Sequence, residues 1–70
     1  MWIQTEDKEK LMNVNQYISI GIQAVNKDGE QRWAVGTIGS FSFNTFKSFK
    51  YKEDAVTYLG QLLEKLNDEN

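Results

Sequence analysis

The stretch that decides the fold spans residues 17–39 and reads YISIGIQAVNKDGEQRWAVGTIG. Two runs rich in β-branched and aromatic residues flank the segment NKDG at residues 26–29, whose composition is typical of a tight turn. In each run apolar residues alternate with small or polar ones, which is the pattern of a strand with one buried face. The stretch therefore predicts a β-hairpin of two core strands.

Two registers are compatible with this hairpin. If residues 28–29 form a two-residue turn with φ > 0 at both positions, Ile22 lies opposite Val35 and one face is continuously apolar. The same segment also suits a type I turn with a glycine bulge, which would set Ile22 against Ala34 and move Trp33 to the other face. We favour the two-residue turn, because a slip of one residue would turn a row of apolar side chains toward water.

The residue types that are missing from the chain exclude most catalytic chemistry. Its 70 residues suffice for one small domain, and they include no cysteine and no histidine. Disulfides, thiolate zinc sites and the common nucleophile–base pairs cannot form without them. The carboxylates of Glu6, Asp7 and Glu9 lie among lysines, as is typical of a solvated turn. We therefore expect a protein that is not an enzyme, with no catalytic residue, no metal and no cofactor.

The charge and the hydropathy of the chain limit where in the cell we expect the protein and which classes of partner we expect it to bind. The chain starts without the basic and apolar segments of a signal peptide, and no apolar run approaches the roughly 20 residues of a membrane span. We expect a cytoplasmic protein that does not bind membranes. The net charge of −2 argues against a general attraction to nucleic acid. Because so small a core has no covalent or metal staple, we expect self-association into a homo-oligomer.

The remaining elements complete an α+β fold. Apolar residues recur at helical spacing near the end of the chain, from Ala55 to Leu66, and predict an amphipathic helix. We predict a curved antiparallel sheet of four to five strands with this helix packed on it. The predicted strands cover about residues 2–5, 10–14, 17–25, 32–38 and 41–49, and the helix covers about residues 52–67. The predicted core comprises Ile18, Ile20, Ile22, Trp33, Val35, Phe41, Phe43, Leu59, Leu62, Leu63 and Leu66.

Three positions break these patterns. Phe46 interrupts the alternation of the last strand, which predicts a bulge or a turn near residues 44–45. The favoured register places Gly21 opposite Gly36, which indicates a need for twist or for a close neighbouring backbone. Gly60 lies at the margin of the helix stripe, where it is either a tolerated residue or the contact point of another element.

The segments WIQT at residues 2–5, LMNVNQYISI at 11–20 and FKYKEDAVTYLGQLLEKL at 49–66 resemble a class of short proteins from Gram-positive bacteria and their phages and plasmids. The likeness is one of pattern and covers most of the chain. It departs from the class at Tyr51, where a small helix-capping residue is usual. The resemblance implies a strand-rich fold with a terminal helix and no established activity, so it carries over no catalytic residue.

These observations support three functional hypotheses. The first is a small interaction module, self-associating, that binds a protein partner through a sheet edge or a helix flank, as a phage or plasmid accessory protein would. The second is single-stranded nucleic-acid binding, in which rings stack on bases and lysines meet phosphates. Its residues would be Phe46, Lys47, Phe49, Lys50, Tyr51 and Lys52, although a half-buried edge strand gives the same pattern. The third, more remote, is sequestration of a small ligand between subunits.

Overall fold

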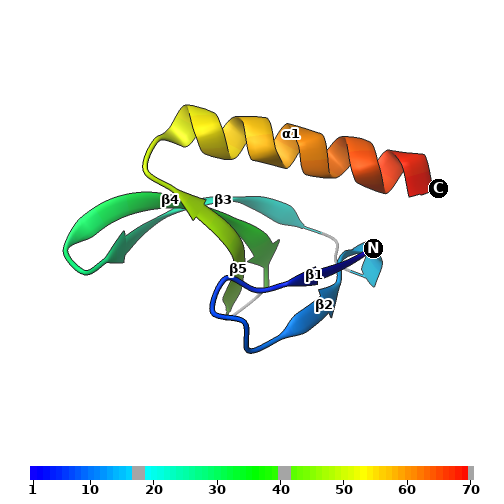
Figure 1. Ribbon diagram of the computed structural model, residues 1–70, viewed down its shortest axis with the longest axis horizontal. Coiled ribbons are helices and arrows are strands. Elements are labelled where there is room, and N and C mark those ends of the chain that lie inside the picture. Colours follow the sequence, from blue (N-terminus) through cyan, green and yellow to red (C-terminus); the bar gives the residue numbers. More distant parts are fainter. Residues whose placement is uncertain (17–18, 40–41, 70) are drawn as a thin grey trace.

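Figure 1 shows a computed structural model of the chain, which describes residues 1–16, 19–39 and 42–69. The five strands form two antiparallel sheets, one of β1 and β2 and one in the order β3-β4-β5, and the helix α1 packs against the three-stranded sheet. The α+β class is confirmed, with the strands divided between two sheets where one sheet was predicted. The elements are β1 (Trp2–Gln4), β2 (Leu11–Asn13), the 3-10 helix η1 (Val14–Gln16), β3 (Ile20–Lys27), β4 (Glu30–Ile38), β5 (Phe43–Phe49) and α1 (Lys52–Glu69).

The β3–β4 hairpin has the favoured register. Ile22 pairs with Val35 and Gly21 with Gly36, and the ladder reaches Lys27 and Glu30 on either side of the turn. The turn residues Asp28 and Gly29 have φ values of 54° and 80°, as a two-residue turn with both residues in the left-handed region requires. The turn itself takes only two residues. β3 therefore continues to Lys27 and β4 begins at Glu30, whereas the sequence predicted that the strands end at residue 25 and begin at residue 32. Residues 17 and 18 of the predicted strand lie outside the described residues.

A β-bulge interrupts the pairing of β4 with β5. Val35 pairs with Lys47 and Gly36 pairs with Thr45, so Phe46 is the extra residue. This irregularity is the one that the broken alternation predicts. The bulge places Phe46 in the core, where its side chain is 5% exposed.

Gly36 permits the close approach of β5 at this bulge. A Cβ atom at this position would lie 1.9 Å from the main-chain oxygen of Asn44, well inside any allowed contact. The neighbouring backbone suggested by the glycine pair is therefore that of β5. Gly60, by contrast, has no atom within 4 Å of a Cβ built on it, so within the described residues it is not a contact point.

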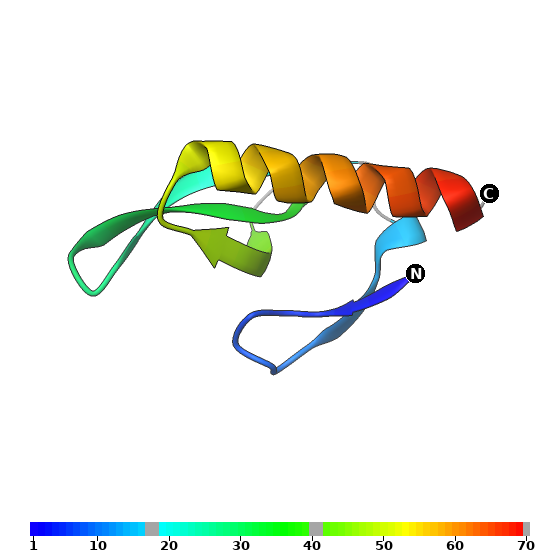
Figure 2. The same ribbon diagram turned by 45° about the horizontal axis from the view of Figure 1, so that its top comes forward.

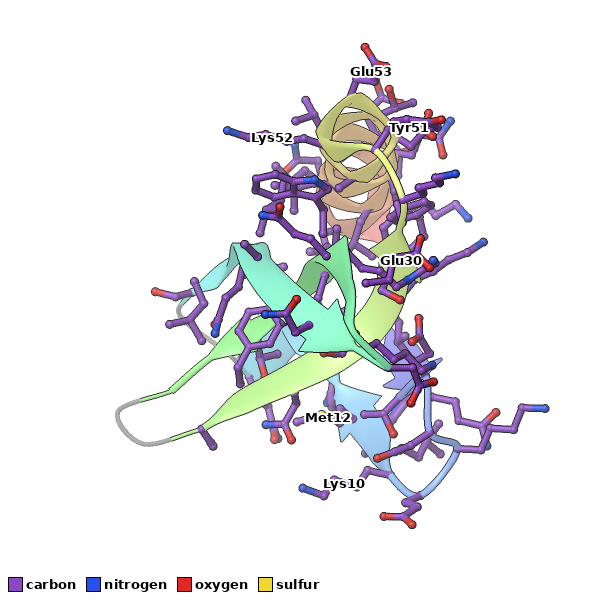
Figure 3. The ribbon with its side chains drawn as sticks, turned by 90° about the vertical axis from the view of Figure 1, so that its left-hand side faces the viewer. Lys10, Met12, Glu30, Tyr51, Lys52 and Glu53 are labelled. Carbon is purple, nitrogen blue, oxygen red and sulfur yellow. The ribbon has the colours of Figure 1, made fainter. Side chains whose placement is uncertain are left out.

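The apolar core lies between α1, β5 and the β1–β2 hairpin. Met12, Val14, Phe46 and Leu62 are buried together, and Ile3, Ile20 and Leu66 pack against them. Figures 1 and 2 show α1 along one face of the three-stranded sheet and the β1–β2 hairpin below the C-terminal half of α1. In the view of Figure 3, the hairpin residue Met12 lies below the sheet strands and α1 lies above them.

The predicted core is partly correct. Val35 and Leu62 are buried, and Ile20, Ile22, Trp33, Phe43, Leu59 and Leu66 are half-buried. Leu63 was placed wrongly, because it lies on the margin of the helix stripe and is 46% exposed. Ile18 and Phe41 lie outside the described residues. Among the described residues, no helix combines the length and the apolar character that crossing a membrane requires.

Candidate interaction surface: the two edges of the three-stranded sheet

The outer edge of β3 carries main-chain groups that β4 does not use. The main-chain N–H of Ile38 donates to the oxygen of Ser19 over 3.0 Å, which fixes the alternation of the ladder. Odd-numbered residues of β3 bond to β4, and even-numbered residues point their N–H and C=O groups away from it. The groups that face outward belong to Ile20, Ile22, Ala24 and Asn26. Within the described residues, no other element bonds to them.

This edge lacks the usual protection against pairing with another strand. Natural edge strands are guarded by charged side chains, proline, bulges or a covering segment. Residues 20–26 include no charge and no proline, and the register with β4 is unbroken along them. Lys27 at the end of the strand is the first charged residue. As far as residues 1–16, 19–39 and 42–69 show, the edge of β3 is therefore long, regular and open.

The opposite edge, on β5, is occupied by the turn of the β1–β2 hairpin. The N–H of Glu6 donates to the oxygen of Thr45 over 2.9 Å, and the N–H of Ser48 donates to the Glu6 carboxylate. The Ser48 hydroxyl donates to the same carboxylate over 2.9 Å. The main-chain oxygen of Ser48 accepts a hydrogen bond from the Arg32 guanidinium over 3.1 Å. A strand could not add to β5 without displacing these contacts.

Opposite charges hold the Glu6 carboxylate in this place. Lys27 Nζ lies 3.5 Å from Glu6 Oε1, and Arg32 Nε donates to the Ser48 hydroxyl over 3.1 Å. Partial burial alone would raise the pKa of Glu6, but the hydrogen bonds from Ser48 and the charge of Lys27 lower it below 4.5. Glu6 is thus an anion that fastens the hairpin to the sheet.

The shape of the β1–β2 turn positions Glu6. Asp7 accepts hydrogen bonds from the Thr5 hydroxyl over 2.6 Å and from the Glu9 N–H over 3.0 Å. These bonds lower the pKa of Asp7. Lys8 has a φ of 66°, which closes the turn. The solvated charge run of the sequence therefore contains a structural carboxylate that the local pattern did not reveal, since its hydrogen-bond partner Ser48 lies 42 residues away along the chain.

The aromatic and lysine residues predicted as a nucleic-acid site do not share one surface. Phe46 is buried, and the Phe49 ring packs on Tyr58 with centroids 5.4 Å apart. Tyr51 is exposed, but Figure 3 shows it on the opposite side of the start of α1 from Lys52.

The three lysines of this segment lie over rings of the protein itself. Their Nζ atoms are 5.4–5.9 Å from the ring centroids: Lys47 over Phe49 and Tyr58, Lys50 over Tyr51, and Lys52 over Trp33. The ammonium groups remain at the surface. Nucleic-acid binding by this segment stays a prediction.

The geometry defines a class of protein, a small α+β domain with a three-stranded sheet. The β5 edge of this sheet is bonded to the β1–β2 hairpin, and we call it the fastened edge. The β3 edge has no such partner within the described residues, and we call it the open edge. Comparison of the chain with protein-family models, curated proteins and solved structures found no match. Among the described residues, no three acidic side chains gather in a way that could hold a metal ion. The two edges of the sheet are therefore the features that point to a function.

Proposed function

We propose that this chain is a small non-catalytic interaction module that pairs with a second copy of itself through the outer edge of β3. The open, uncharged edge of this strand is the observation that carries the proposal. A partner protein that offers an extended strand would compete for the same groups. The resemblance to phage and plasmid proteins suggests that such a partner is a host protein.

The spacing of the outward groups defines the pairing. An antiparallel arrangement with its twofold axis at Gln23 sets Ile22 opposite Ala24 of the second copy and Ile20 opposite its Asn26. Every outward N–H and C=O of the uncharged stretch then has a partner. The same arrangement joins two three-stranded sheets into one continuous sheet. It also places the two Gln23 side chains side by side across the axis.

Sedimentation equilibrium of the wild type and of Gln23→Lys tests this arrangement. Because the axis lies at residue 23, the substitution sets two ammonium groups against each other and should prevent pairing. We expect dimers for the wild type at tens of micromolar and monomers for Gln23→Lys. Gln31→Lys is the control, since it makes the same charge change on β4, one strand away from the edge.

Two results would overturn the proposal. One is a wild-type chain that sediments as a monomer up to the highest soluble concentration. The other is a dimer that Gln23→Lys and Gln31→Lys weaken equally. If the two copies paired through β3, the charge on β3 would weaken the dimer more than the charge on β4.

A further inference from the structure

A recess lies beside the small sheet, between β1 and α1. Its volume is about 390 Å³. Met1 and the β1 residues Trp2 and Ile3 line one side of it, and Tyr58, Gln61, Leu62 and Lys65 line it from α1. Trp2 and Ile3 point to opposite faces of their strand, so the recess runs along the strand's edge and not over one face. We call this recess the β1–α1 groove.

The edge of β1 that faces away from β2 offers main-chain groups. The N–H of Val14 donates to the oxygen of Met1, and the N–H of Thr5 donates to the oxygen of Lys10, each over 2.9 Å. Odd-numbered residues of β1 therefore bond to β2, so Trp2 and Gln4 direct their N–H and C=O groups to the other side. A short extended chain could add to β1 there, as peptides add to the edge strands of recognition domains.

The walls of the groove give it an apolar floor and a positive rim. Leu62 is buried at the floor, and Trp2, 63% exposed, leaves most of its indole open to a ligand. Burial raises the pKa of Tyr58, so its hydroxyl stays neutral and able to bond at physiological pH. Lys65 is the charged side chain among the lining residues, and no described residue forms an ion pair with it.

We propose that the β1–α1 groove binds an extended peptide of a partner protein, which adds as a strand to β1, places an apolar side chain against Trp2 and Leu62, and sets an acidic side chain at Lys65. The main-chain groups of Trp2 and Gln4 supply strand pairing, and the apolar floor and the lysine supply selectivity. This binding does not use the outer edge of β3, because no residue of β3 lines the groove.

Selection from a displayed library of random linear octapeptides tests the proposal. The bait is the full chain, as wild type, Lys65→Glu and Lys50→Glu. We expect the wild type to enrich peptides with alternating apolar residues and an aspartate or glutamate. Lys65→Glu should instead enrich peptides with lysine or arginine. Lys50→Glu should select like the wild type, because Lys50 precedes the N-terminus of α1 and does not line the groove.

Synthetic copies of the enriched peptides are then titrated into ¹⁵N-labelled protein. The N–H signals of Trp2 and Gln4 should shift and gain protection from exchange, and Lys65→Glu should weaken the binding of the acidic peptides about fivefold, the upper range for an exposed ion pair. The Gln23→Lys variant should bind the peptides equally well, which separates this site from the edge of β3.

Three outcomes would overturn the proposal. The library could yield no enriched peptide. Enriched peptides could shift the signals of β3 and leave Trp2 and Gln4 unchanged. The signals of Trp2 and Gln4 could respond to protein concentration alone, which would make a second copy of the chain the occupant of the groove.

Discussion

The two outer strands of the three-stranded sheet differ in whether another segment of the chain bonds to the main-chain groups along their outer sides. Both β3 and β5 direct main-chain groups away from β4. On β5 the hairpin turn occupies these groups through Glu6, Thr45 and Ser48. On β3, within the described residues, nothing occupies them. The domain thus fastens one edge of its sheet with its own N-terminal segment, and the other edge is open within the described residues.

The largest expected effect concerns the close approach that makes the fastened edge possible. Gly36→Ala should lower the free energy of unfolding by about 3 kcal/mol or more, because its Cβ would overlap the backbone of β5 at Asn44 and force the bulge apart. Urea denaturation measures the change. Gly60→Ala is the matched control, and it should stabilise the protein by about 0.5–1 kcal/mol, since it adds a helix-favouring methyl group in open space.

If both glycine variants changed the stability by similar amounts, β5 would not cross β4 as closely as described. The bulge and the position of Phe46 in the core would then need another explanation.

Removal of the Glu6 carboxylate should open the edge of β5. Glu6→Ala leaves the N–H of Ser48 without its acceptor and Lys27 without its ion partner, so the free energy of unfolding should fall by about 1–2 kcal/mol. Hydrogen exchange should quicken at Ser48. Glu9→Ala is the control, because its carboxylate forms no ion pair within the described residues. Equal effects of the two substitutions would contradict the role of Glu6.

Acidification should loosen the same edge. The pKa of Glu6 in the folded protein lies below 4.5, so its carboxylate stabilises the fold fully above that pH, and this contribution is lost as the pH falls through the folded value. Urea midpoints measured between about pH 6 and pH 3 should fall for the wild type and fall less for Glu6→Gln. Asp7 titrates in the same direction, so a residual slope should remain. Parallel profiles would contradict the account.

The smallest expected effect lies at the open edge. Gln23→Lys should change the stability of the monomer by no more than about 0.5 kcal/mol, because the Gln23 side chain is exposed and its main-chain bonds to β4 are kept. Denaturation at low protein concentration, where the wild type is also monomeric, checks this. A large loss of stability would mean that Gln23 supports the fold and not the association.

The sequence predicted the open edge better than the fastened one. The hairpin register followed from the alternation of isoleucines and from the Asp28-Gly29 turn, which are local signals, and it placed β3 correctly against β4. The C-terminal helix followed from its apolar stripe. Both elements are specified by residues close together along the chain, so periodicity and turn chemistry suffice to identify them.

The fastened edge depends on contacts that no local pattern encodes. In the sequence Glu6 is one of several charges in a predicted solvated turn, and only the folded hairpin brings it to Ser48 of β5. Met12 and Val14 belong to a predicted short strand, and their burial with Phe46 and Leu62 depends on contacts with distant parts of the chain. Phe46 belongs to a segment that resembles a stacking site, and only the bulge shows that its ring enters the core.

Hydrogen exchange of the main-chain N–H groups of Ile22 and Ala24, measured at several protein concentrations, tests the central claim most directly. These groups point away from β4, so they are unprotected in the monomer. The account predicts that their exchange slows as the concentration rises, while the exchange at Ser48 stays constant. Exchange at Ile22 and Ala24 that remains fast at every concentration, in a sample that sediments as a dimer, would contradict it.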